Sequence, residues 1–393
     1  MSLDEDLLRS AIGFRDRIGV LSFYVSHMPR QAAEQQSPAT IELRNQLRSM
    51  TDEAIARDGG LGKAVQRCID ANSDHLEWLT SPRTSGRGRA LFIGVESGQS
   101  LAVTVQLPFS TRVILDACAY VRPLIAAHDE GREAGLCDVS QDTLRLWRWQ
   151  AGDITPVLRR EFEVLDEQVA HQKRGPAPTN GHMFGRGNSN REQFAGHLDE
   201  LDQRFLLQGI AEVAVLAKEY GWDRIVLSGS TKLRKAAAGM LASAPDLRVI
   251  EADREAGTES SSALAAVAWP LLRSVRQERD RELVNSIREG ALSGGLGALG
   301  MRAVCNALNE GRVRHLCYDD SLNLAGYRSE AGTLHARVEG LVASSDLAMR
   351  PEPLFIERMV EAALSQDAGI TPLSPEVAGD LGDSEGVGAL LRW

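Results

Sequence analysis

The spacing of apolar residues in the first third of the chain predicts three helices and three strands. The helices cover residues 1–16, 41–56 and 61–79. The strands cover residues 19–25, 90–95 and 100–107. The last two strands are of the kind that form a hairpin, here around Ser97-Gly98. Residues 1–129 are therefore predicted to form one small α/β domain.

The middle of the chain changes to a meander followed by alternating helix and strand. Three strands separated by short polar turns are predicted at 136–140, 143–149 and 154–164. A long helix over 190–220, ended by Gly221, precedes a strand at 224–228, a helix at 231–242 and a strand at 247–251. This order is that of a ribonuclease-H-like domain, an α/β fold with a mixed sheet, which we assign to residues 130–268.

The last third again alternates helix and strand. A highly charged helix is predicted over 271–291, followed by a glycine turn, a helix to Glu310, a strand at 313–318 and a helix at 351–365. The apolar ending, Gly386–Trp393, is predicted to be a buried final strand. Residues 269–393 are therefore expected to form a C-terminal α/β/α sandwich, which makes the chain a multidomain α/β protein.

Composition agrees with a soluble protein of two or three domains. The chain has 393 residues, of which 43% are hydrophobic and 25% charged. It contains no apolar run of the roughly 20 residues needed to span a bilayer, and residues 1–16 are too charged for a signal peptide. We expect a cytoplasmic protein without a membrane partner. A net charge of -10 excludes a protein that grips nucleic acid over its whole surface, but it leaves room for local basic elements.

The cysteines predict buried free thiols. Their number is odd, they are widely spaced, and no pair has the C-x-x-C spacing of a zinc or redox site. They are Cys68, Cys118, Cys137, Cys305 and Cys317.

One segment departs from the acidic background of the chain. Between Gln168 and Arg191 there is no carboxylate, and the cations are Lys173, Arg174, Arg186 and Arg191. This local reversal of charge predicts that the segment approaches a negatively charged partner. Its glycines and prolines predict an exposed loop over 172–189, and an alternative is an ordinary surface loop without a function. Ser189 and Glu192 fit a capping box, so a helix begins near Asn190 with Gln193 in its first turn.

The loop and the C-terminus resemble a known family. Phe184-Gly185-Arg186-Gly187-Asn188-Ser189, leading into a helix with Phe194 on its buried face, is similar to the GRGGQ-helix segment of class 1 eukaryotic and archaeal peptide-chain release factors. Residues 307–313 and the ending Gly386–Trp393 resemble the third domain of that family. The nearest likeness is to bacterial members of the archaeo-eukaryotic release factor superfamily, which includes Pelota-like and peptidyl-tRNA-cleaving quality-control factors.

The resemblance implies where a reaction takes place and where this chain departs from the family. In release factors the glycine loop enters the peptidyl-transferase centre, and its glutamine helps water attack the ester that joins peptide to tRNA. Here Gly187-Asn188-Ser189 stands where the family has Gly-Gly-Gln. The candidate catalytic residues are Gln193, Ser189 and Asn188. The candidate contacts to tRNA and ribosomal RNA are Arg174, Gly185, Arg186, Gly187 and Arg191.

Three functions stay open at this point. The first is peptidyl-tRNA hydrolysis in ribosome rescue or quality control, with residues 181–193 in the peptidyl-transferase centre. The second is a non-catalytic rescue or hibernation factor that only binds the ribosome. The third is a metal-dependent nuclease with Asp138 as a metal ligand, although we expect Asp138 to be a turn-adjacent or capping residue. For the first two we expect a monomer that binds the ribosome, including its rRNA and peptidyl-tRNA, with a translational GTPase as a further partner and no cofactor or metal.

Three other patterns have ordinary explanations. Gly295, Gly297 and Gly300 satisfy G-x-G-x-x-G, with Asp319 about 20 residues further on, but no strand precedes them, so we interpret them as a turn between helices rather than an NAD site. Trp147 and Trp149 share a strand face with Arg145 and are expected to pack in a core or between domains rather than to stack on RNA. The histidines near the loop lack metal-ligand spacing and are expected to add positive charge near RNA; they are His171, His182 and His197.

Overall fold

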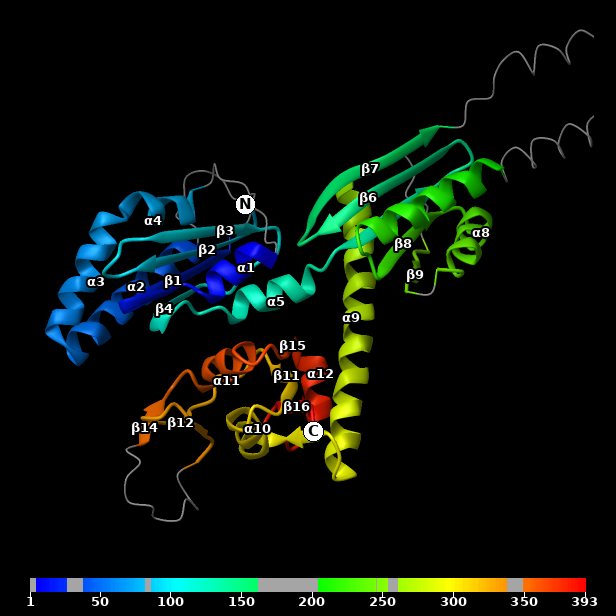
Figure 1. The fold of residues 1–393 in the computed structure, drawn as a ribbon. Helices are drawn as coiled ribbons and strands as arrows, with labels where there is room; N and C mark the ends of the chain where they lie inside the picture. The colour runs from blue at the N-terminus through cyan, green and yellow to red at the C-terminus, as the bar shows by residue number, and fades with distance from the viewer. Residues whose placement is uncertain are drawn as a thin grey trace, which may run out of the picture. The chain divides into compact units, whose positions relative to one another are not determined.

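The computed structural model describes residues 5–26, 38–81, 86–161, 204–244, 246–253, 261–337 and 349–393. The contacts within it divide the chain into two compact units (Figure 1). The first combines residues 1–131 with 274–393, and the second contains residues 132–273. The division into domains 1–129, 130–268 and 269–393 stays a prediction.

The N-terminal part of the first unit is an antiparallel sheet with helices on one face. Its strands, in the order β3-β2-β1-β4, are β1 (Arg15–Ser26), β2 (Gly88–Gly94), β3 (Ser100–Val105) and β4 (Arg112–Cys118). Leu21, Phe23 and Val25 alternate along β1 towards one face, where they pack with α2 (Pro38–Arg57), α3 (Gly59–Ala71) and α4 (Ser73–Thr80). On the other face, Tyr24 packs edge-on against Phe109, with ring centroids 5.1 Å apart. The remaining helices are α1 (Glu5–Ile12) and α5 (Arg122–Glu130).

Two predictions for this part are corrected. Residues 61–79 are not one helix, because α3 ends and α4 begins at Asn72, whose backbone (φ -113°, ψ 26°) is not helical and whose side-chain amide and backbone N–H both donate to the Cys68 carbonyl. The strand β4 and the helix α5 were not predicted, since Pro108 was taken as the end of the sheet. The predicted hairpin between 90–95 and 100–107 is confirmed, with Gly98 at φ 66° in its turn.

The C-terminal part of the first unit is a sheet covered on both faces. Its order is β10-β16-β11-β15, where β10 is Gly297–Leu299, β16 is Val387–Leu391, β11 is Val313–Asp319 and β15 is Gly369–Leu373. Cys317 packs on one face with Val284 and Ile287 of α9 (Ser261–Leu292) and with α12 (Pro375–Ala378). Tyr318 points the opposite way, and burial together with the nearby carboxylates of Asp320 and of Glu357 on α11 (Phe355–Leu364) raises the pKa of its hydroxyl. The predicted sandwich and the buried final strand are therefore confirmed.

Smaller elements complete this part, and two predicted boundaries are wrong. The elements are α10 (Gly300–Asn309), β12 (Gly326–Ser329), β13 (Leu334–His335), β14 (Met349–Glu352) and the 3-10 turn η1 (Gly379–Leu381). The helix predicted at 351–365 begins only at Phe355, because Pro351 lies in β14 and Pro353 in the turn that follows it. The charged helix begins ten residues before Leu271, since α9 continues through Pro270 instead of starting after it.

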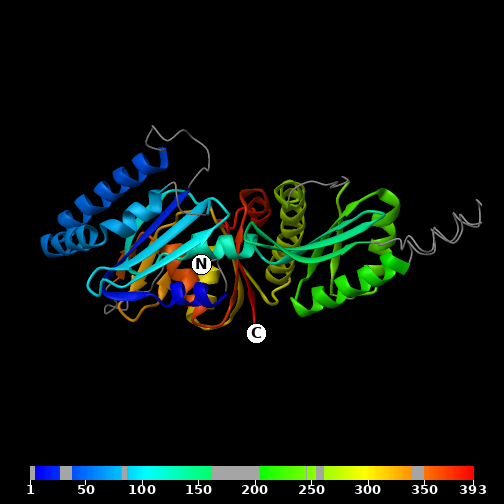
Figure 2. The ribbon, with the colours of Figure 1, turned by 90° about the horizontal axis from the view of Figure 1, so that it is seen from above.

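The second unit is a mixed sheet in the order β7-β6-β5-β8-β9. Its strands are β5 (Ala134–Val139), β6 (Thr143–Gln150), β7 (Asp153–Glu161), β8 (Arg224–Gly229) and β9 (Arg248–Glu251). The first three pair antiparallel, and β8 and β9 are parallel to β5. One face packs with the helix over 204–219 and with α8 (Thr231–Leu241), and the other packs with Leu264, Ala268 and Leu272 of α9 (Figure 2). The mixed α/β architecture predicted for the middle of the chain is confirmed; the ribonuclease-H-like assignment stays a prediction.

Burial bears out two further expectations. All five cysteines are free and buried. Trp149 is buried against Trp269, with ring centroids 5.6 Å apart, and Trp147 packs on the same cluster, so both tryptophans serve packing as expected. Within the described residues, no helix is long and apolar enough to cross a membrane.

Candidate functional site

All the predicted site residues lie in the segment 162–203, which is outside the described residues. They are Arg174, Gly185, Arg186, Gly187, Asn188, Ser189, Arg191 and Gln193. The three histidines near the loop lie in the same segment. What the structure does describe is the pair of elements between which this segment runs, the end of β7 at Glu161 and the helix that starts at residue 204.

The two elements that flank the segment are joined across the surface of the second unit. Arg160, next to the end of β7, donates through Nε to Oε2 of Glu212 on the helix over 204–219. Both side chains are more than a third exposed, so the pair contributes little to stability and serves mainly to fix the direction of the two elements. Arg159 is likewise paired, with Glu161. Two cations at the end of β7, Arg159 and Arg160, are thus each paired with a carboxylate.

Apolar packing holds the flanking helix to the sheet. Leu206, Ile210, Val213 and Ala217 recur at helical spacing and are buried against Leu144 and Leu146 of β6, among others. Gly209 allows this approach, because a Cβ placed there would lie 2.8 Å from Cδ1 of Leu144. Gly221 takes φ 67° after the helix, as predicted for the residue that ends it.

Asp138 has a different setting from the one predicted. It lies inside β5, is 6% exposed, and its Oδ1 accepts a hydrogen bond from the Ser228 hydroxyl of β8 at 2.7 Å. A metal site for nucleic-acid cleavage needs several convergent carboxylates. Within the described part of the chain, no group of three or more His, Cys, Asp or Glu side chains could hold a metal ion. Asp138 is therefore a buried partner of Ser228 rather than a turn or capping residue.

The G-x-G-x-x-G glycines serve close packing. They do not form a simple turn between helices, because β10 lies within them. A Cβ at Gly297 would lie 2.3 Å from the carbonyl oxygen of Ile287, so only glycine allows β10 to lie against α9. At the start of α10, where a dinucleotide phosphate would sit, the Met301 N–H donates to the Glu385 carboxylate at 3.0 Å. An anion already occupies that helix terminus, which argues against an NAD site.

Comparison with known families gives one match, over less than half of the chain. Residues 120–271 match the family model described as bacterial archaeo-eukaryotic release factor family 10. Over these residues the chain is similar to bacterial archaeo-eukaryotic release factors. No curated protein matches it.

Several solved structures are also similar to this chain. An archaeal translation termination factor, aRF1, shares 18% identity over 99% of this chain and 96% of its own, with a TM-score of 0.25. Pelota of Archaeoglobus fulgidus shares 14% over 78% of this chain and 79% of its own, with a TM-score of 0.35. A ribosome-bound archaeal Pelota shares 11% over 100% of this chain and 95% of its own, with a TM-score of 0.40.

The release-factor-like chain also has a buried polar junction that the sequence did not reveal. It lies within the first unit, between α11 and the residues around β4 and the start of α5. Arg358 is paired with three carboxylates, those of Asp116, Glu352 and Glu361. Glu357 is fully buried, and its Oε1 accepts from the Val121 N–H at 2.9 Å. Burial raises the pKa of Glu357 to about 8, despite this bond and the nearby Arg122 guanidinium. In the sequence, the only sign of this junction is the position of Glu357 and Arg358 within a helical apolar pattern. The helix α11 buries both of these charged residues.

Proposed function

We propose that this release-factor-like chain associates with the ribosome, directs residues 181–193 to the peptidyl-transferase centre and hydrolyses peptidyl-tRNA in ribosome rescue or quality control. The observation that carries the proposal is the family match, because residues 120–271 enclose the whole loop segment. The described flanks are compatible with it, since β7 pairs within the sheet and the helix over 204–219 packs on the same sheet, and these two elements bound the 42 residues 162–203.

The chemistry asked of the loop is modest. Hydrolysis of the ester between peptide and tRNA needs a water positioned on the carbonyl carbon and a site that shields the reaction. In this proposal the Gln193 amide orients that water, and the Ser189 hydroxyl and the Asn188 amide supply further hydrogen bonds to it. Neither an amide nor a free hydroxyl is a strong base at neutral pH, so the proton passes to the departing 3′-oxygen of the tRNA or to solvent. These residues contribute by positioning the attacking water.

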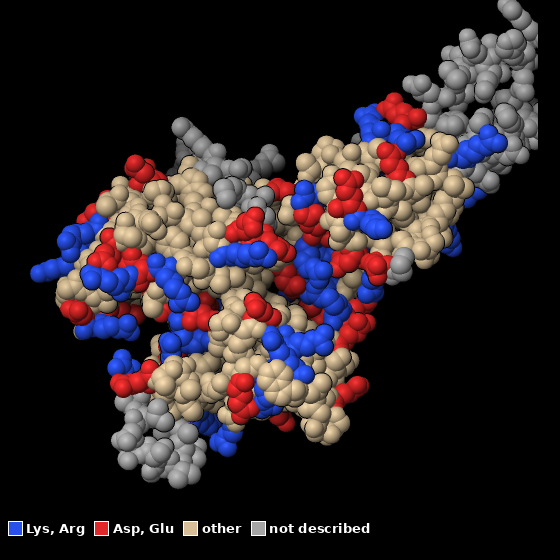
Figure 3. All heavy atoms as spheres, viewed as in Figure 1, with Lys and Arg blue, Asp and Glu red and all other residues tan. Residues whose placement is uncertain are grey.

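The cations of the segment supply the binding. Arg174, Arg186 and Arg191 can pair with phosphates of the tRNA end and ribosomal RNA, where guanidinium groups make two parallel hydrogen bonds. Gly185 and Gly187 let the backbone approach RNA closely. On the face shown in Figure 3, basic and acidic side chains of the described residues are intermixed. That face therefore has no large basic surface that would bind RNA in place of the loop. A translational GTPase as escort, a monomeric state and action in the cytoplasm belong to the same proposal.

The sequence also favours a second candidate, a factor that binds the ribosome without cleaving. Asn188-Ser189 stands where the family's loop has Gly-Gln. A chain that lost the glutamine could keep the cations and occupy the site only.

One pair of measurements separates the two candidates. Ribosome pelleting tests association, and incubation with stalled ribosome–nascent-chain complexes tests release of the peptide. Peptidyl-tRNA hydrolysis predicts both co-sedimentation and release, whereas the second candidate predicts co-sedimentation alone. Arg186→Glu is expected to weaken pelleting by about tenfold, with Lys235→Glu on α8 as a matched control of unchanged binding. A protein that does not bind ribosomes at all contradicts both candidates.

A further inference from the structure

One edge of the N-terminal sheet in the first unit is open to another chain. In the order β3-β2-β1-β4, strand β4 is at the end and pairs only with β1. An edge strand presents backbone N–H and C=O groups that a further strand can bind. A hollow beside β4 gives this edge a place for a ligand.

The Gln46 side chain of α2 shows which backbone groups of β4 point outward. Its Oε1 accepts from the Val113 N–H at 3.0 Å, and its Nε2 donates to the Thr111 carbonyl at 3.0 Å. The Val113 N–H therefore points away from β1. Because the outward-facing residues of an antiparallel strand alternate, Leu115 presents its N–H and C=O in the same direction. Within the described part of the chain, no side chain binds the Leu115 N–H in the way that Gln46 binds the Val113 N–H.

Gln46 thus forms two of the hydrogen bonds that a neighbouring strand would form with this edge. These bonds do not extend to Leu115. The Gln46 amide offers one acceptor and one donor to β4, which are the two groups that a neighbouring strand would offer at that position. A side chain satisfies the edge at this one position. The outward-facing N–H and C=O groups of Leu115 are available to a ligand.

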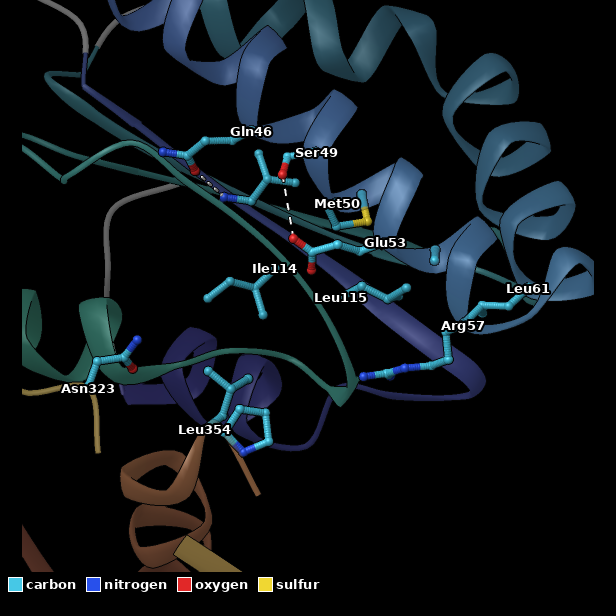
Figure 4. Close-up of a pocket in the computed structure, with 13 residues that line it drawn as sticks. Gln46, Ser49, Met50, Glu53, Arg57, Leu61, Ile114, Leu115, Asn323 and Leu354 are labelled. Carbon is cyan, nitrogen blue, oxygen red and sulfur yellow. Dashed lines mark hydrogen bonds between the residues drawn. The ribbon is translucent and has the colours of Figure 1, made fainter. Parts of the chain in front are cut away.

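A hollow of about 400 Å³ runs beside this part of the edge. α2 lines one side with Gln46, Ser49, Glu53 and Arg57, and Pro353 and Leu354 line another. In Figure 4 the Arg57 guanidinium reaches back from the end of α2 towards the hollow, and Leu354 lies across from β4. Glu53 is turned towards Ser49, whose hydroxyl lies 3.5 Å from its Oε1. The hollow therefore combines a backbone edge, an apolar wall formed by Pro353 and Leu354, and the Arg57 cation, while the one carboxylate in its described lining, Glu53, faces Ser49.

We propose that the β4 edge binds an extended, acidic polypeptide segment of a partner protein as an added strand. The backbone of the segment continues the ladder at Leu115, and one of its carboxylates pairs with Arg57. Backbone bonds of this kind provide affinity, and the side chains of the groove provide selectivity. This site is separate from the 181–193 loop, so it does not depend on whether the loop cleaves peptidyl-tRNA.

The test uses the full-length protein and a defined probe, an acetylated and amidated heptapeptide of alternating valine and aspartate. Binding is measured by fluorescence anisotropy of a labelled copy, and its place by hydrogen exchange read by mass spectrometry. The expected result is slower exchange in residues 111–118 and a smaller change elsewhere. No binding at millimolar peptide, or protection confined to other segments, would overturn the proposal.

Two sets of controls distinguish an added strand from adhesion to the surface. Alternate amides of a strand face the same side. One peptide is therefore N-methylated on its valines and another on its aspartates, and one of the two is expected to lose binding while the other keeps it. Equal behaviour of the two peptides contradicts strand addition.

The protein variants test the cation in the hollow. Arg57→Glu is expected to weaken binding by about tenfold. Arg48→Glu, on the same helix but outside the hollow, is expected to leave it unchanged. A valine–lysine heptapeptide is expected to bind more weakly than the acidic one. Loss of equal size in both variants would show that only net charge matters and would overturn the role of Arg57.

Discussion

Arg358 of α11 forms an ion pair with Asp116 of β4, and the two side chains are only 5% and 18% exposed. The pair joins residues 242 positions apart within the first unit. Arg358 also contacts Glu352 and Glu361, so one guanidinium is shared by three carboxylates at this junction. The arrangement ties the C-terminal sandwich of the unit to the edge strand of its N-terminal sheet.

Removing the cation should be costly because it leaves buried carboxylates without a partner. Arg358→Ala is expected to lower the free energy of unfolding by about 3–5 kcal/mol, measured by urea denaturation at pH 7. Arg350→Ala provides the control, since Arg350 pairs with Glu330 at an exposed site and should change stability by less than about 1 kcal/mol. Equal and small effects of the two substitutions would show that the junction contributes nothing to folding.

Glu357 should make stability fall as pH rises. Its pKa is about 8 in the folded chain and 4.5 as a free side chain, because burial disfavours the carboxylate. The folded state therefore holds a proton that the unfolded state has released between these values. The free energy of unfolding should decrease from about pH 4.5 to about pH 8 through this group.

Glu357→Gln removes that titration while keeping an oxygen that can accept from the Val121 N–H. At pH 8 the variant is expected to be more stable than wild type by on the order of 2 kcal/mol, and near pH 5 the two should be similar. Urea denaturation at both pH values checks this. A difference between the two proteins that is the same at pH 5 and pH 8 would contradict the buried, protonated state of Glu357.

Gly297 should tolerate no side chain. Gly297→Ala places a methyl group against the Ile287 carbonyl and is expected to destabilise the protein by roughly 1–3 kcal/mol, measured by denaturation. Gly239→Ala is the matched control, because nothing lies within 4 Å of its Cβ position in α8, and it should stabilise by about 0.5–1 kcal/mol. The same interpretation predicts no change in NADH fluorescence on adding the protein.

Local patterns in the sequence were enough to predict most elements of the second unit. The strands of the meander are short, rich in β-branched and aromatic residues, and bounded by polar turns, and all three are present. Single residues misled the prediction elsewhere. The helix predicted from Leu271 starts ten residues earlier in the structure and contains Pro270, and Asn72 breaks a helix whose apolar spacing runs on without interruption.

Features that depend on distant residues could not be predicted in this way. The exposure of the β4 edge follows from its place in the sheet order, and the burial of Glu357 from packing against residues more than 200 positions away. The candidate catalytic loop is the opposite case. Its residues were chosen from local charge, capping and resemblance, and their roles remain predictions because they lie outside the described residues.

The most direct test of the central claim is peptide release from purified, stalled ribosome–nascent-chain complexes. Wild type and Gln193→Ala should pellet equally with the complexes, since Gln193 is neutral and is not proposed to bind phosphate. We predict that wild type converts peptidyl-tRNA to free peptide and tRNA, and that Gln193→Ala does so about 100-fold more slowly. Equal rates for the two proteins, or no release by wild type bound to the ribosome, would contradict the account.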